Sequence, residues 1–308
     1  MIMFDVKEIK GVIPALMTVF DENENVYEKG MRELVSYLLK EGVEGFYLTG
    51  STGEGFLMNE SERKQVVEIV LDEVGGRVPV IVHVGAISTK ISIELARHAE
   101  AAGADAISSV PPFYWRFTPE HIFNYYKDIS DAVSLPMIVY NVPLAGIMGL
   151  DLIKRLASID GVKGIKFTAT SHHEISMIKN EIGNEFMVYS GADEMAVSGL
   201  LHGADGIIGS FYNLMPEMFL KISQLVKEER LTEAMAIQKE AVSIIMYALK
   251  KDYYSVMKVA LRWMGVDAGY VRRPFMNIQG KEEEELKAGF IDLRDSLQIK
   301  DVKFLDAI

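Results

Sequence analysis

Short apolar segments alternate along the chain with longer segments in which apolar residues recur every three or four positions. The short segments are rich in Val, Ile, Phe and Tyr and are flanked by Gly or Pro, which predicts β-strands. We expect strands over residues 11–20, 45–49, 79–83, 106–110, 136–140, 162–167, 186–189 and 206–208. The longer segments predict amphipathic helices over residues 28–40, 60–74, 88–102, 118–131, 150–157, 171–180, 194–201 and 215–227.

Eight strand–helix alternations predict an α/β fold with a parallel sheet covered by helices, and eight such units can close into a (β/α)8 TIM barrel. The runner-up is an open doubly wound sheet, which usually carries a glycine-rich fingerprint after its first strand. Here the first strand ends in Met17-Thr18-Val19-Phe20, without that fingerprint. We therefore predict the barrel.

The alternation stops near residue 228. Residues 231–249, 253–264 and 281–297 are helical in pattern, with no strand between them. We expect a barrel domain over residues 1–228 and a C-terminal helical extension over residues 229–308. The extension is expected to pack on the barrel and to contribute to an interface between subunits; a lid over the site is the alternative.

Composition excludes several function classes. Thirty-two basic and 44 acidic residues give a formal charge of −12, which repels phosphate backbones and makes nucleic acid an unsuitable partner. The chain has no cysteine, which excludes disulfides, iron–sulfur clusters and cysteine zinc sites.

Nothing in the sequence predicts a membrane partner. Residues 132–150 carry no charge but contain two prolines, two glycines and Asn141, so we interpret them as strand and loop up to the start of the next helix. Residues 1–7 lack the long apolar run of a signal peptide. We expect a soluble, cytoplasmic protein.

In a TIM barrel the active site lies where the strands end, so polar residues at those positions are the candidates. The second strand is followed by Thr49-Gly50-Ser51-Thr52-Gly53-Glu54-Gly55, whose glycines, hydroxyls and backbone N–H groups suit an anion. The seventh is followed by Gly191, Asp193 and Glu194, which suit sugar hydroxyls better than a phosphate.

Lys166 lies near the end of the sixth strand, where strand alternation places it on the opposite side from Ile165 and Phe167. An amine inside the barrel is costly to keep charged, and a neutral amine can form a Schiff base with a carbonyl. The alternative to a reactive amine is an ordinary lysine whose side chain reaches solvent at the strand end. Tyr140, at the end of the fifth strand, is a candidate proton relay or a structural core tyrosine.

Metal chemistry is not expected. His172 and His173 are adjacent, so they do not share a helix face, and neither they nor His83 accompany an Asp/His cluster with ligand spacing.

Taken together, the motifs Gly50–Glu54, Tyr140–Pro143, Gly164–Lys166 and Gly206–Ser210 resemble the pyruvate-dependent class I aldolases, the family that includes N-acetylneuraminate lyase and dihydrodipicolinate synthase. The similarity runs from about residue 10 to about residue 215, and the C-terminal helices continue it.

The resemblance implies roles for individual residues. Lys166 would form the Schiff base with pyruvate, Tyr140 would relay the proton, and Ser51 with Thr52 would hold the pyruvate carboxylate. Tyr114 would reach a neighbouring subunit's site, in a family that is commonly homotetrameric. No cofactor beyond the covalent Schiff base is implied.

Within that family the sequence is more similar to the lyase branch. In the synthase an arginine shortly after the Tyr-Asn-Val-Pro motif grips a second carboxylate, but residues 141–153 contain no basic residue. In the lyase branch, sugar-binding groups match this chain at Thr168, Gly191, Asp193 and Glu194 and over Gly209–Asn213, which includes Ser210. Ile208, in the Gly206–Ser210 motif, is a further candidate substrate-binding residue. Two features depart from the pattern: the segment after Pro143 is shorter, and Ala192 replaces a larger residue.

We therefore predict a Schiff-base lyase that cleaves a 2-keto-3-deoxy sugar acid, foremost N-acetylneuraminate, to pyruvate and an aldehyde sugar. The alternatives are a dihydrodipicolinate synthase, which condenses pyruvate with aspartate semialdehyde, and a non-catalytic sensor of pyruvate or sugar acids on the same barrel.

Overall fold

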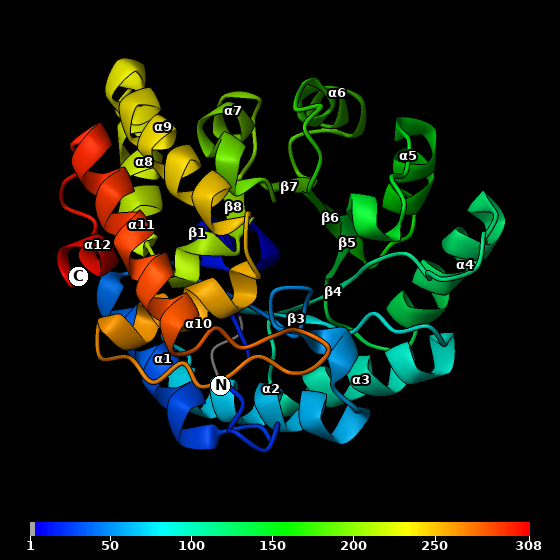
Figure 1. Cartoon of the computed structure of the whole chain (residues 1–308). Helices are drawn as coiled ribbons and strands as arrows, with labels where there is room; N and C mark the ends of the chain where they lie inside the picture. The colour runs from blue at the N-terminus through cyan, green and yellow to red at the C-terminus, as the bar shows by residue number, and fades with distance from the viewer. Residues whose placement is uncertain (1–3) are drawn as a thin grey trace.

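The computed structural model describes residues 4–308, in which eight parallel strands form one sheet at the centre of the molecule (Figure 1). Part of the signal-peptide expectation rests on residues 1–3, which lie outside the described residues. The strands are β1 (Gly11–Pro14), β2 (Phe46–Leu48), β3 (Val80–His83), β4 (Ala106–Ser109), β5 (Met137–Asn141), β6 (Val162–Phe167), β7 (Met187–Ser190) and β8 (Gly206–Gly209).

Each strand pairs in parallel with the next along the chain from β2 to β8, and β8 pairs with β1. The ring closes between β1 and β2, where Ala15 bridges Tyr47 and the Leu16 N–H donates to the Tyr47 carbonyl at 2.8 Å. The predicted (β/α)8 TIM barrel is confirmed.

Helices surround the barrel, as the alternating pattern predicts. They are α1 (Glu28–Glu41), α2 (Glu60–Val74), α3 (Thr89–Ala102), α4 (Pro119–Ser130), α5 (Leu150–Ala157), α6 (His173–Ile182), α7 (Ala196–Leu201) and α8 (Pro216–Lys227). Local signals set several ends. Asn59 accepts from the Glu62 N–H in a capping box that begins α2, and Gly42, at φ 90°, ends α1 in the left-handed conformation.

The first strand is shorter than predicted. It was expected over residues 11–20, but β1 ends at Pro14. Beyond it, the Ala15 and Leu16 N–H groups still donate to the backbone of the neighbouring strands, and side chains bind other groups: Asn213 donates to the Ala15 carbonyl and accepts from the Met17 N–H, and Lys258 donates to the Thr18 carbonyl. These bonds satisfy the backbone without a strand, so an apolar run continues there as buried loop.

Four helices follow the barrel. Three of them match the predicted segments, namely α9 (Leu231–Ala248), α10 (Tyr253–Trp263) and α11 (Lys281–Leu297), and the fourth is the short α12 (Lys303–Asp306). Figure 1 shows them, in yellow to red, gathered on the side of the barrel that carries α8 and α1. In residues 4–308 we find no helix with both the length and the apolar character needed to cross a bilayer.

Two apolar layers define the inside and outside of the barrel. Ile165 and Phe167 of β6 pack in the large core between the strands and the helices. Ile138 and Tyr140 of β5 and Tyr189 of β7 pack in a smaller core enclosed by the strands. Because Lys166 pairs in register with Tyr140 on one side and Tyr189 on the other, it belongs to this inner layer. The predicted orientation of β6 is thus confirmed.

Candidate active site

Lys166 lies at the C-terminal end of the barrel with its amine enclosed by aromatic rings. The residue is 4% exposed, and its Nζ lies 4.4 Å from the ring centre of Tyr47 and 4.3 Å from that of Tyr140. Both ring centres lie within the distance of a cation–π contact. The amine and the Tyr140 phenol, predicted to work together, are therefore neighbours.

Tyr47 was not among the predicted site residues. Its hydroxyl donates to Ser108 Oγ at 3.0 Å, and Ser108 donates to the Ile138 carbonyl at 2.7 Å, which fixes the ring beneath the amine. Burial, followed by the nearby Tyr140, raises the pKa of Tyr47 well above its usual value, so this phenol stays neutral. Phe46 and Leu48 pack in the core between the strands and the helices, so strand alternation places Tyr47 on the inner side of the barrel. This alternation is the sequence signal that could have predicted Tyr47 as a site residue.

His83 completes the aromatic group at the end of β3. Its ring lies 6.2 Å from those of Tyr47 and Tyr140, and its Nε2 accepts from the Val110 N–H at 3.2 Å. Burial, with a smaller effect of Arg63, lowers the pKa of His83 well below its usual value. The imidazole is therefore neutral and places no positive charge beside Lys166.

The predicted anion loop, residues 49–55, joins β2 to the turn that precedes α2. Thr52 is 5% exposed, and its Oγ1 shares a 2.7 Å hydrogen bond with Ser210 Oγ from the end of β8. Ser51 lines an apolar cavity of about 310 Å³ beside Phe56, Val142 and other residues of the barrel mouth. The structure thus brings the β2 and β8 ends together through hydroxyl groups.

Gly191 allows the end of β7 to approach Lys166 closely. A Cβ at Gly191 would lie 1.9 Å from Thr168 Oγ1 and 3.1 Å from Lys166 Cε. Thr168 Oγ1 is buried, and within residues 4–308 it has no hydrogen-bond partner. A buried hydroxyl of this kind is ready to bind a polar ligand group.

Asp193 and Glu194 begin the turn after β7, as predicted. Asp193 is 6% exposed, and its Oδ2 accepts from the Phe211 N–H at 2.8 Å. Burial raises the pKa of Asp193 to about 7, although the Phe211 hydrogen bond opposes the shift. Its carboxyl therefore changes charge near neutral pH, while Glu194 stands beside it in the wall of a cavity.

That cavity has a volume of about 520 Å³ and opens above the ends of β6, β7 and β8. Thr168, Gly191, Asp193, Glu194 and Ser210 all line it, so five of the predicted binding residues meet at one place. The C-terminal helices form another wall, through residues that sequence reasoning did not include: Ile245, Leu249 and Tyr253.

Two predicted site residues lie elsewhere. Ile208 is fully buried in the inner core of the barrel and does not line the cavity. Tyr114 is 82% exposed at φ 82°, with its ring against Trp115, and it lines neither cavity described above. The expected role of Tyr114 at a neighbouring subunit's site stays a prediction.

Residues 4–308 contain no group of three or more His, Asp and Glu side chains placed to hold a metal ion. What the site does offer is an enclosed amine, a phenol beside it, a hydroxyl-bearing loop and a polar cavity with carboxylates. An amine in this position can form an imine with a carbonyl compound, and the phenol beside it can transfer a proton to or from the adjoining carbon chain.

Comparisons with known proteins agree with this geometry. The model of the dihydrodipicolinate synthetase family matches residues 8–291. The N-acetylneuraminate lyase of Citrobacter koseri is 38% identical over 286 residues, which cover 92% of this chain and 96% of that protein.

Solved structures are similarly close. A catalytic lysine mutant of the Ruminococcus gnavus sialic acid aldolase superposes with a TM-score of 0.90 at 33% identity, covering 99% of this chain and 98% of that one. CdNal from Clostridium difficile, in complex with mannosamine, gives 0.89 at 32% identity, covering 96% of this chain and all of that one. The chain belongs to the dihydrodipicolinate synthetase family.

Proposed function

We propose that this protein is a Schiff-base lyase that cleaves N-acetylneuraminate, a 2-keto-3-deoxy sugar acid, to pyruvate and N-acetylmannosamine. The observation that carries the proposal is the Lys166 amine, held between the rings of Tyr47 and Tyr140 beside a cavity lined by carboxylates and hydroxyls. Relatives named N-acetylneuraminate lyase and a similar structure holding mannosamine support this substrate class.

The reaction starts at the amine. Neutral Lys166 adds to the C2 carbonyl of the open-chain sugar acid, loss of water gives an imine, and protonation of the imine nitrogen gives an iminium. Tyr140 takes the proton of the C4 hydroxyl as it passes its own phenolic proton to the hydroxyl groups of the relay, the C3–C4 electron pair moves toward the iminium nitrogen, and the aldehyde sugar leaves. The resulting enamine is protonated at C3, and water then releases pyruvate and regenerates the amine. The iminium supplies the electron sink, so this route uses no added cofactor.

The remaining groups hold the two ends of the substrate. Ser51 and Thr52 would receive the carboxylate of the pyruvate half, with Thr52 fixed by Ser210. Thr168, Gly191, Asp193 and Glu194 would face the polyhydroxy chain, since the carboxylates accept hydrogen bonds from hydroxyls. We also propose that Tyr114 of one subunit completes the proton relay of its neighbour in a homotetramer, which fits its exposure here.

Borohydride trapping tests the proposal. Incubation with pyruvate and sodium borohydride should leave one reduced adduct per chain, which peptide mass mapping places on Lys166. A parallel assay of pyruvate release from N-acetylneuraminate, and of condensation of pyruvate with aspartate semialdehyde, should show turnover only in the first. An adduct on another lysine, or none, would refute the mechanism; turnover of the semialdehyde alone would refute the substrate.

A further inference from the structure

A buried ion pair joins the anion loop to the C-terminal helices. Glu54 ends the Gly50–Glu54 motif, and Lys258 lies on α10, 204 positions later in the sequence. Their side chains are 0% and 1% exposed, and Lys258 Nζ lies 2.7 Å from Glu54 Oε1. Neither residue has a part in the reaction as proposed above.

Lys258 uses all three of its donors. Besides Glu54, it donates to the Thr18 carbonyl at 2.7 Å and to the Tyr270 carbonyl at 2.6 Å. An ammonium has three N–H groups, so it is fully satisfied without water. Lys258 therefore fastens three segments to one point: the chain after β1, the loop after β2 and the segment that follows α10.

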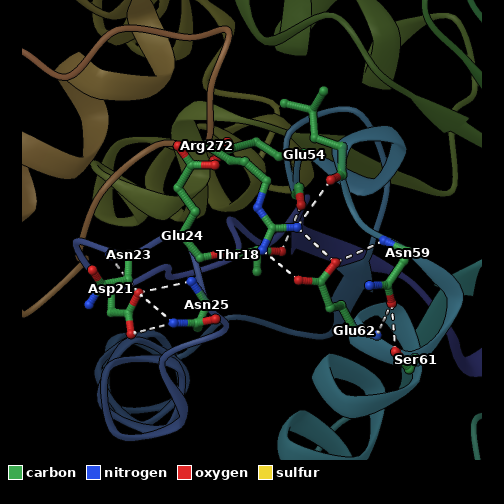
Figure 2. Close-up of polar contacts among 12 residues, drawn as sticks. Thr18, Asp21, Asn23, Glu24, Asn25, Glu54, Asn59, Ser61, Glu62 and Arg272 are labelled. Carbon is green, nitrogen blue, oxygen red and sulfur yellow. Dashed lines mark hydrogen bonds and ion pairs between the residues drawn. The ribbon is translucent and has the colours of Figure 1, made fainter.

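The second carboxylate oxygen of Glu54 is also occupied. Glu54 Oε2 accepts from the Arg272 N–H at 2.8 Å. The Arg272 guanidinium binds Glu62 of α2 through two nitrogens at 2.7 and 2.8 Å, and it donates to the Leu57 carbonyl at 3.0 Å. Figure 2 shows Arg272 reaching Glu62 with Glu54 and Thr18 beside it. The loop is thus held on both sides.

The backbone of the loop needs this support. Glu54 has φ 53° and ψ 30°, and Thr49 at the other end also has φ 53°, although neither is glycine. Such conformations persist only where the surroundings impose them, and they concentrate at ligand sites. A further bond acts on the same stretch, because Thr18 Oγ1 donates to the Gly53 carbonyl at 2.6 Å.

We propose that Glu54 and Lys258 are positioning residues that hold residues 49–55 in the shape in which Ser51 and Thr52 receive the substrate carboxylate. This rests on the function proposed above. It makes the C-terminal extension, through Lys258 on α10, part of the support of the carboxylate site. Stability alone is a poor reason for the pair, because apolar residues often replace a buried ion pair without loss.

The test measures how pyruvate concentration governs borohydride trapping of Lys166 in Glu54→Gln. The amide nitrogen of glutamine would face either the Lys258 ammonium or the Arg272 N–H, which are both donors, so the loop must shift. The half-saturating pyruvate concentration should rise about ten- to a hundredfold, the scale that displacements of about 1 Å produce. The trapping rate at saturation should stay close to that of the unmodified protein, because the amine is untouched.

Lys179→Met is the matched control. Lys179 forms a largely buried ion pair with Asp205, which precedes β8 at the opposite end of the barrel. Its loss should lower the melting temperature without changing the half-saturating concentration.

The outcomes separate the two proposals. A folded Glu54→Gln protein with an unchanged half-saturating concentration, or an equal rise in Lys179→Met, would overturn the positioning role. If Glu54→Gln does not fold, the double variant Glu54→Gln, Lys258→Met removes the pair without leaving an unpaired buried charge, and the same readings apply to it. Absence of a pyruvate adduct in the protein without substitutions would instead refute the proposed function.

Discussion

Asp193 should make the stability of this protein fall as the pH rises from about 4 to 7. In the unfolded chain an aspartate titrates near pH 3.9, whereas burial raises the pKa of folded Asp193 to about 7. Below pH 4 the carboxyl is protonated in both states, so it has no effect. Between the two values only the unfolded state ionises, and the folded state loses relative stability with each pH unit. Above pH 7 the difference is constant.

The size of the effect follows from the two pKa values. At 1.36 kcal/mol per pH unit, the interval amounts to about 4 kcal/mol. For a chain of 308 residues, with about 2.1 cal/mol/K of unfolding entropy per residue, this corresponds to about 6 °C in Tm. Since this loss comes from one ionisation, a side chain of the same shape that cannot ionise should abolish it.

Asp193→Asn supplies that side chain, because the asparagine oxygen can still accept from the Phe211 N–H. Melting temperatures of both proteins between pH 4.5 and 8 give the difference. The Asp193→Asn variant need not be more stable at any one pH, but its Tm relative to the unsubstituted protein should increase by about 5 °C across this narrower range. Asp160→Asn is the control, since it removes the same charge from a side chain that is fully exposed. A Tm difference that does not vary with pH would refute the reasoning.

Three further changes test the site. Tyr140→Phe should lower pyruvate release about 10²- to 10⁴-fold while leaving borohydride trapping of pyruvate intact, and a similar loss in both assays would contradict a proton-relay role. Gly191→Ala places a methyl group against Thr168 Oγ1 and should cost about 1–3 kcal/mol of stability; Thr168→Ala in the same chain should recover much of the lost Tm, and no recovery would place the strain elsewhere. Thr52→Val breaks the bond to Ser210 and should raise the half-saturating pyruvate concentration about tenfold. Ser210→Ala should act alike, and the double variant should be no worse than either alone, whereas additive losses would show that the two hydroxyls act separately.

Much of the site could be predicted because parallel strands impose a simple rule. Alternation fixes the side of the sheet to which Lys166 points, and barrel closure brings the ends of β2, β5, β6, β7 and β8 together. The same rule applied to β2 would have placed Tyr47 beneath the amine. Tyr47 is the middle residue of a three-residue strand, and the loop that follows it carries the more distinctive sequence motif.

The rule fails where side chains, and not neighbouring strands, bind the backbone. Residues 15–20 are as apolar as a strand, but Asn213 and Lys258 bind their backbone from far along the chain, so β1 ends at Pro14. No local sequence pattern predicts that a side chain so distant in sequence will bind this backbone. The sequence around Lys258 does hold a weak signal. Its neighbours Val256, Met257, Val259 and Ala260 are apolar, which predicts that Lys258 is buried together with an acidic partner.

The C-terminal helices, expected mainly to pack on the barrel, hold both ends of the site. On α10, Lys258 binds Glu54 of the loop that would receive the carboxylate. On α9, Gln238 donates to the Asp193 carbonyl at 3.1 Å and accepts from the Val197 N–H at 3.1 Å, which fixes the turn that would bind the sugar hydroxyls. A barrel ending at residue 228 would keep Lys166 and Tyr140 but lose both supports. The barrel and the C-terminal extension, which the sequence pattern separates, are therefore joined by hydrogen bonds at both ends of this site.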